Sequence, residues 1–187
     1  LASQNDIEIS VIPGPSAVTA ALSISGLDTR YFHFEGFLPS EGSKRRDRLK
    51  SLSSVGETIV LYEAPHRLKK TLKELLESLG ETRKIAVVKE LTKKHETVRW
   101  FTLGEAELYY EENEPRGEYV LVLEGRPKEE IEAEKQKSFE ALSIEAHVEM
   151  YEEQGFDQKE AMKKAAKDRG ITKREISVPI CISHKSG

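Results

Sequence analysis

Short segments rich in β-branched and aromatic residues alternate with helical patterns between residues 31 and 126, and this alternation most constrains the fold. The strand-like segments are YFHFEGFL at 31–38, ETIVLYE at 57–63, KIAVVKE at 84–90, ETVRWFTL at 96–103 and EYVLVLE at 118–124. Helical patterns lie between them at 44–52, 65–79 and 104–112. Because strands that alternate with helices pack in layers, we predict an α/β fold of helices on a sheet.

The chain begins with IEISVIPGPSAVTAALSISG at 7–26, which predicts a strand and a helix joined by a proline-glycine turn. Apolar and polar residues alternate over 7–12 as in a half-buried strand, and Gly14 and Pro15 suit the N-cap and first position of a helix. One strand and one helix do not make a domain. We therefore expect residues 1–30 to be the last strand and helix of a domain whose other part lies outside this sequence.

The remainder, residues 127–187, has a wholly helical pattern in which the turns GFD and GIT separate three segments. Asp157 with Glu160, and Thr172 with Glu175, each fit a capping box, in which two side chains satisfy the free N–H groups at a helix start. Short helices joined by such turns resemble a helix-turn-helix. We predict a small helical extension.

The composition is that of a soluble globular protein, with 37% hydrophobic and 33% charged residues. No apolar run approaches the roughly 18 residues that a membrane span needs. The sequence has no basic segment followed by an apolar one, as a secretory signal would, and its single Cys181 has no partner for an internal disulfide. We expect a cytoplasmic protein.

Charge is unevenly distributed, although the formal net charge is only -4. The run KRRDRLK at 44–50 has five basic residues and one acid, residues 128–153 have nine glutamates against three lysines, and the sign reverses again over 155–175. Arginine contacts phosphate bidentately, so the run at 44–50 is at least as consistent with an RNA-facing patch as with a solvated helix face.

The turn VIPGPSA is a candidate ligand site. A helix that starts at a glycine turn leaves the backbone N–H groups of Ser16 and Ala17 free for a carboxylate or a phosphate. The signal is weak by itself, because the turn matches neither a dinucleotide-binding nor a phosphate-loop motif. An ordinary strand-to-helix turn explains it as well.

Four glutamates close apolar strand-like segments: Glu35, Glu63, Glu90 and Glu124. If several of these strands are parallel, their carboxyl ends share the edge at which open α/β sheets bind ligands. For any one of them, the alternative is a boundary residue that caps a helix or pairs with a nearby Lys or Arg. Together they favour a site.

The stretch YEAPHR places His66 and Arg67 at a helix start. His33, His66 and His95 have no metal-ligand spacing, and the cysteine is far away, so we expect no metal site. No motif indicates a covalent nucleophile.

Several stretches, in this order, resemble the ribosomal RNA small subunit methyltransferase I family: IPGPSAVTAALSISGL, FEGFLP followed by KRRDRL, YEAPHRL, ELTKKHET and RGEYVLVLEG. The similarity covers residues 7 to about 125, and the helical extension resembles that family's C-terminal region up to Ile176, after which the pattern departs. The family belongs to the tetrapyrrole methylase superfamily, in which two α/β domains enclose S-adenosylmethionine in a cleft. Its members methylate a cytidine 2'-hydroxyl in the decoding region of 16S rRNA.

This resemblance implies that residues 1–30 close an N-terminal cofactor-binding domain, that 31–126 form a three-layer α/β/α methylase domain with a mixed five-stranded sheet, and that 127–187 form the extension. The bulk of the N-terminal domain is not in this sequence, so we expect the chain alone to be inactive. The resemblance also implies a homodimer that acts on 16S rRNA in the small ribosomal subunit, with neither DNA nor a membrane as partner.

Site residues follow from these motifs together with the charge pattern. Residues expected to bind the cofactor are Pro13, Gly14, Pro15, Ser16, Ala17, Tyr62, Leu91 and Gly125. Residues expected to contact RNA are Lys44, Arg45, Arg46, Arg48, His66, Arg67, Lys93 and Lys94.

Methyl transfer from a sulfonium is an in-line displacement, so the enzyme mainly positions donor and acceptor and helps to remove the proton of a weakly acidic ribose hydroxyl. A glutamate, with a reference pKa of about 4.3, is a weak base unless desolvation raises its pKa. We predict Glu90 as this base and Glu63 as the second candidate. Lys93 and Lys94 would alternatively bind phosphate or stabilise a developing alkoxide.

Two other functions are consistent with the sequence. One is a non-catalytic RNA-binding module built on the basic run and the helical extension. The other is a different tetrapyrrole or diphthine-type methylase, which should lack both the KRRDR run and the extension.

Overall fold

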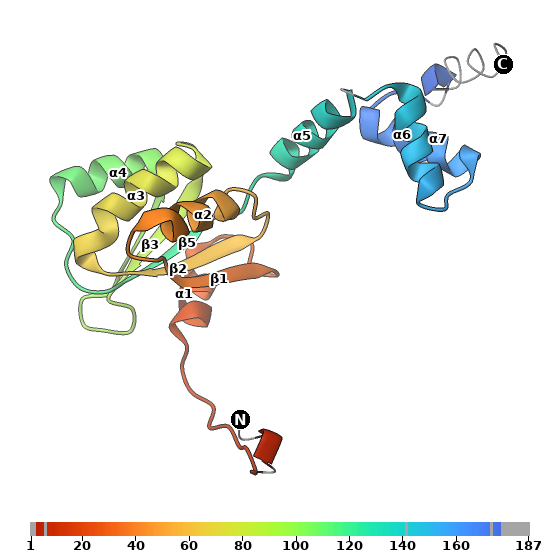
Figure 1. Ribbon diagram of the computed structural model, residues 1–187. Coiled ribbons are helices and arrows are strands. Elements are labelled where there is room, and N and C mark those ends of the chain that lie inside the picture. The colour runs from red at the N-terminus through yellow and green to blue at the C-terminus, as the bar shows by residue number, and fades with distance from the viewer. Residues whose placement is uncertain (1–2, 6, 141, 173, 177–187) are drawn as a thin grey trace. The chain divides into compact units, whose positions relative to one another are not determined.

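The computed structural model describes residues 3–5, 7–140, 142–172 and 174–176. The chain divides into two compact units, Leu1–Arg126 and Pro127–Gly187 (Figure 1). Near the N-terminus there is one short 3-10 helix, Ser3–Asn5. No helix in the described part of the chain is both long enough and apolar enough to cross a membrane.

The first unit is built on a five-stranded sheet with the strand order β1-β2-β5-β3-β4. Its strands are β1 (Phe32–Phe37), β2 (Thr58–Glu63), β3 (Lys84–Lys89), β4 (Thr97–Thr102) and β5 (Tyr119–Leu123). The pair β1–β2 is parallel, whereas β2–β5, β5–β3 and β3–β4 are antiparallel. The sheet is therefore mixed, as predicted, and β1, β2 and β3 run in the same direction.

Helices cover both faces of this sheet, which is why its central strands are apolar in their middle and largely buried. Every residue of β5 is buried, and so is every residue of β2 except the half-buried Tyr62. Continuous apolar runs of this kind are typical of strands that are covered on both sides. In the edge strands β1 and β4, by contrast, exposed residues are interspersed with half-buried ones.

Three helices pack on one face of the sheet and one on the other, as Figure 1 shows. They are α2 (Gly42–Leu52), α3 (Pro65–Leu79) and α4 (Leu103–Glu112) on one face, and α1 (Ala17–Ser25) on the other. Helix α3 begins with Pro65 in its first turn and presents Leu68, Leu72 and Leu75 to the core. This three-layer α/β/α arrangement confirms the predicted fold class.

The start of α1 differs from the sequence-based prediction. The helix begins at Ala17 with Ser16 as N-cap, not with Gly14, and it ends at Gly26, whose φ of 72° is left-handed. Residues 7–12 form no strand, and their side chains are exposed. The predicted strand is wrong because a strand needs a partner for its backbone N–H and C=O groups, and no strand among the described residues pairs with it.

Helix α1 is fixed to the sheet at its C-terminal end. The indole Nε1 of Trp100 donates to the carbonyl of Ser25 at 2.9 Å, and the Thr58 hydroxyl donates to the carbonyl of Asp28 at 2.5 Å. Thr58 is the first residue of β2. The C-terminus of α1 therefore lies at the edge where β2 begins, and its N-terminus points toward the edge where β2 ends.

The second unit is helical, as predicted. Its helices are α5 (Lys128–Glu140), α6 (Ile144–Glu153) and α7 (Gln158–Arg169). The buried residues of its core are Val148, Ala161, Ala165, Ala166 and Ile176. The first of the three predicted helical segments is thus two helices, because Ser143 caps a new start by accepting the N–H of Ala146.

Both predicted capping signals are present in this unit. The side chain of Asp157 accepts the N–H of Glu160 at 2.8 Å, and Thr172 and Glu175 exchange bonds between their side chains and backbone N–H groups. The predicted departure after Ile176 lies outside the described residues.

Candidate active site

The ends of β1, β2 and β3 meet at one edge of the sheet, which we call the carboxyl edge. In register, Phe37 lies beside Tyr62, and the ends of β2 and β3 both lie beside Tyr119 at the start of β5. Loops that follow parallel strands in open α/β sheets carry ligand sites at this edge. A ligand site is therefore expected at the carboxyl edge.

Two predicted cofactor residues lie at this edge on the face that α1 covers. Tyr62 and Leu91 pack against the apolar cluster that contains Val18, from the first turn of α1. The side chain of the N-cap Ser16 makes no capping bond to that first turn. Because the first N–H groups of a helix have no intrahelical partners, the start of α1 offers donors on the sheet face that also carries Tyr62 and Leu91.

Glu90 sits at the end of β3 in a strained loop. Its φ is 52° and that of Thr92 is 65°, in the left-handed region that side-chain-bearing residues rarely adopt. The carboxylate of Glu90 accepts the N–H of Glu118 at 2.8 Å and the Nζ of Lys93 at 3.1 Å. The loop conformation is thus held by two bonds to one carboxylate.

These bonds oppose the pKa change that a general base would need. The backbone N–H of Glu118 and the ammonium of Lys93 hold the pKa of Glu90 below its ordinary value. The sequence-based argument required desolvation to raise it. In this conformation Glu90 is an ionised but weakly basic carboxylate.

Glu63 lies on the opposite face of the sheet, under α3. It is buried, and its two oxygens accept the N–H of Ala64, the Nε of Arg67 and the hydroxyl of Thr71 at 2.8, 2.8 and 2.6 Å. A carboxylate with this many donors is satisfied without a ligand. The contacts of Glu63 support a structural role.

The other two strand-end glutamates do not share the carboxyl edge. Because β5 runs antiparallel to its neighbours, Glu124 follows its opposite end, and so does Gly125, so the prediction that they join this site is wrong. A Cβ on Gly125 would lie 2.2 Å from the carbonyl of Gly56, so this glycine allows a close backbone approach. Glu35 lies within β1, where Arg48 and His33 bind it.

The basic run over α2 separates into structural and exposed residues. Arg45 is buried and bonds Glu74, Thr71 and the carbonyl of Pro39, so its predicted contact with RNA is wrong. Arg48 is half-buried and paired with Glu35. The predicted RNA-contacting residues that remain exposed are Lys44, Arg46, His66, Lys93 and Lys94.

Sequence reasoning missed an aromatic cluster beside Tyr62. Phe34 and Phe37 contact the Tyr62 ring edge-to-face, with centroids 5.1 and 5.6 Å away, and both remain about half exposed. A register shift between Phe34 and Gly36 turns Phe37 to the same face. The glycine in FHFEGF, two residues after Phe34, is the signal that identifies this bulge.

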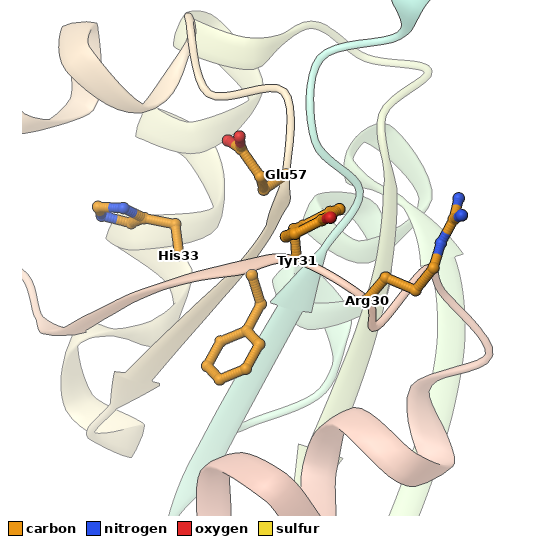
Figure 2. Close-up of a pocket in the computed structure, with 5 residues that line it drawn as sticks. Arg30, Tyr31, His33 and Glu57 are labelled. Carbon is orange, nitrogen blue, oxygen red and sulfur yellow. The ribbon is translucent and has the colours of Figure 1, made fainter.

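A hollow of about 530 Å³ lies away from this site, at the start of β1. Arg30, Tyr31, Phe32, His33 and Glu57 line it, and Figure 2 shows His33 and Arg30 on opposite sides of Tyr31. None of the predicted site residues lines this hollow. Within the described ranges there is also no group of three or more His, Cys, Asp or Glu side chains that would hold a metal ion.

Comparison with known proteins decides the family. The family model for Tetrapyrrole (Corrin/Porphyrin) Methylases matches residues 1–107, more than half of the chain. The chain belongs to the tetrapyrrole methylase family. Solved structures agree on the fold: a cobalt precorrin-4 methyltransferase of cobalamin biosynthesis has a TM-score of 0.50 at 20% identity over 65% of this chain and 54% of its own. A diphthine synthase has a TM-score of 0.50 at 15% identity over 66% and 51%.

The resemblance seen in the sequence is also confirmed. The chain is 44% identical over 165 residues to the ribosomal RNA small subunit methyltransferase I of Bacillus subtilis (strain 168), covering 88% of this chain and 56% of that protein. The protein of the same name from Synechocystis sp. is 38% identical over 91% of this chain and 60% of its own. The chain thus spans less than two thirds of these relatives.

Proposed function

We propose that this tetrapyrrole methylase chain is part of an S-adenosylmethionine-dependent enzyme that methylates the 2'-hydroxyl of a cytidine in the decoding region of 16S rRNA. The observation that carries this proposal is that Tyr62 and Leu91, at the carboxyl edge, pack against the apolar cluster to which Val18 in the first turn of α1 belongs. The relatives named ribosomal RNA small subunit methyltransferase I supply the substrate class.

The side chains at this edge suit the cofactor. N–H groups at the start of α1 are donors for a carboxylate, and Tyr62 and Leu91 provide surface for the apolar parts of a nucleoside. The exposed segment from Pro13 to Ala17 leads into these donors. When bound, S-adenosylmethionine supplies an electrophilic methyl group on a sulfonium. Gly125 is not part of this set because it lies at the opposite edge.

Of the two predicted carboxylates, we retain Glu90 as the group that accepts the ribose proton. It stands at the carboxyl edge and is ionised at neutral pH, because the N–H of Glu118 and Lys93 lower its pKa. Lys93 bonds this carboxylate, so a phosphate that draws Lys93 away would make Glu90 more basic. Lys44, Arg46, His66 and Lys94 are exposed and remain available to RNA phosphates.

A chimera tests this function. The chain replaces the matched 165 residues of the Bacillus subtilis protein in a strain that lacks that protein, and mass spectrometry of 16S rRNA nucleosides measures ribose-methylated cytidine. We expect methylation to be restored. A folded chimera that binds S-adenosylmethionine by calorimetry but leaves the rRNA unmethylated would contradict the assigned substrate.

We further propose a cytoplasmic homodimer, since the small ribosomal subunit is cytoplasmic and the edge strand β1 exposes the rings of Phe34 and Phe37. Sedimentation velocity at rising concentration tests the association. A monomer at every concentration would remove this part of the proposal.

A further inference from the structure

Helix α7 carries a row of lysines on its outer face. Lys159, Lys163 and Lys167 follow one another at four-residue spacing, and all three are exposed. Residues four apart share a helix face, and eight residues of helix rise about 12 Å. The buried residues of α7 are Ala161 and Ala165, opposite the row, and Ala166, which borders it. The row, which we call the lysine face, therefore points away from the core of the second unit.

The acidic residues of α7 do not neutralise this face. Asp168 accepts a hydrogen bond from the hydroxyl of Tyr151 and lies 3.5 Å from the imidazole of His147. Its carboxylate therefore faces the interior of the unit and not the lysines. Glu160 is exposed three residues before Lys163 but forms no ion pair with a lysine of the row among the described residues. Among the residues that the structure describes, none forms an ion pair with a lysine of the row. The lysine face is therefore a basic surface whose three lysines have no ion-pair partner within the described part of the chain.

The neighbouring helix has the opposite charge. Glu145, Glu149 and Glu152 are exposed on α6, on the side away from the buried His147 and Val148. The same small unit thus has one basic and one acidic outer face. Because a nucleic acid is repelled by the second and attracted by the first, this arrangement favours binding through the basic face.

The lysine face is also rigidly held. The guanidinium of Arg169, at the end of α7, donates to His147 Nδ1 at 3.0 Å and to the carbonyls of Leu142 and Ser143. Lys164, which is not in the row, lies over the Phe156 ring at 4.2 Å. Its charge is therefore partly satisfied by packing, whereas the three lysines of the row extend into solvent.

We propose that the lysine face of α7 is a second RNA contact, which binds the phosphate backbone of rRNA while the carboxyl edge of the first unit binds the reacting nucleotide. Each strand of a nucleic-acid duplex carries a phosphate about every 3.4 Å, so a row of about 12 Å spans several of them. The choice of RNA over another polyanion rests on the proposed function. The contact is electrostatic and carries no base specificity.

The test uses the full chain and a fluorescein-labelled RNA hairpin of mixed sequence. Fluorescence anisotropy gives the Kd between about 50 and about 200 mM KCl, and each phosphate contact contributes about 0.7 to 0.9 to the slope of log Kd against log salt. The triple variant Lys159→Gln, Lys163→Gln, Lys167→Gln is expected to reduce that slope by about 2 to 3. The corresponding Lys→Arg triple variant should keep the wild-type slope.

A matched control removes the same charge elsewhere. The variant Lys69→Gln, Lys73→Gln, Lys84→Gln loses three lysines from the first unit, two of which pair with Glu114 and Glu124. We expect it to keep the wild-type slope. An equal reduction in both variants, or in neither, overturns the proposal, as does tighter binding of duplex DNA than of RNA.

The salt-slope measurement and the chimera test can fail separately. If the α7 variant has a smaller slope of log Kd against log salt and the chimera is inactive, the methyltransferase assignment is contradicted and the RNA contact of the lysine face is supported. If the chimera is active and the α7 variant keeps the wild-type slope, the methyltransferase assignment is supported and the RNA contact of the lysine face is contradicted. Far-UV circular dichroism of each variant shows whether the helices remain folded.

Discussion

Gly117 lies directly beneath Glu90: a Cβ atom placed on this glycine would come within 2.6 Å of the Glu90 carboxyl carbon. Gly117 has a φ of 85° and comes just before β5, whereas Glu90 ends β3. The loop that carries the candidate base is therefore packed on a glycine at which an added side chain would displace the Glu90 carboxylate.

Replacing Gly117 with alanine should destabilise the first unit and displace Glu90. The left-handed backbone alone costs roughly 1–2 kcal/mol, and each bond that the displaced Glu90 carboxylate loses adds about 0.5–1.5 kcal/mol. Gly42→Ala is the matched control, because its φ is 82° and nothing lies within 4 Å of its added Cβ. Urea unfolding followed by the fluorescence of Trp100 measures both, and equal losses would refute the packing explanation.

Glu90→Gln should reduce methyl transfer by the chimera about 100- to 1000-fold, because a general base contributes on that order. The pKa of Glu90 is lowered by Glu118 and Lys93, so the wild-type rate should not titrate through this group between about pH 6 and pH 8. A wild-type rate that rises with pH through a midpoint in that range would contradict this expectation. If the rise is absent from Glu90→Gln, bound RNA raises the pKa of Glu90.

Glu63→Gln should act on stability. The substitution replaces a buried charged acceptor of three donors, which costs about 1–3 kcal/mol of unfolding free energy. Urea unfolding measures this loss. A chimera with Glu63→Gln that keeps its stability and loses activity would return Glu63 to the catalytic candidates.

Arg45 and Arg46 are adjacent in sequence but should behave in opposite ways. Arg45→Gln leaves Glu74 and Thr71 without a buried donor and should cost roughly 3–5 kcal/mol, the range for breaking a buried pair. Arg46→Gln removes an exposed charge and should weaken RNA binding at low salt with little effect on unfolding. Anisotropy and urea unfolding on both variants separate these effects, and an exchange of the two outcomes would contradict the burial of Arg45.

His147 should make the second unit sensitive to acid. Burial, and then the charge of Arg169, lower its pKa, so the folded unit keeps it neutral between the rings of Phe139 and Tyr151. The unfolded chain binds the proton more tightly, and stability should therefore fall as the pH drops below about 6.5.

Circular dichroism and fluorescence separate the two units in this experiment. The sequence has one tryptophan, Trp100, in the first unit, so its fluorescence reports that unit while far-UV circular dichroism reports both. His147→Phe keeps the ring stack and should remove the loss of helical signal between about pH 6.5 and pH 5, whereas the exposed His66→Gln should not. An unchanged pH response in His147→Phe would assign the acid sensitivity to other groups.

Much of the local structure follows from neighbouring residues alone. Pro65 and the leucines spaced three and four residues apart specify α3 and its bounds. Asp157 and Thr172 mark helix starts because their side chains accept the backbone N–H three residues later. The motifs of the sequence likewise identified the family. These features depend on sterics and hydrogen bonds within a few residues, which the sequence states directly.

Only the tertiary structure decided which of these residues share a site. The antiparallel direction of β5 sends Glu124 and Gly125 to the far edge, and the two-residue alternation of β2 turns Glu63 under α3 while Tyr62 faces α1. Strand direction, strand partners and the face that a helix covers are set by contacts between distant parts of the chain. Local sequence therefore determined the helices and the paired strands, whereas long-range packing determined the site and left residues 7–12 without the strand that their pattern predicts.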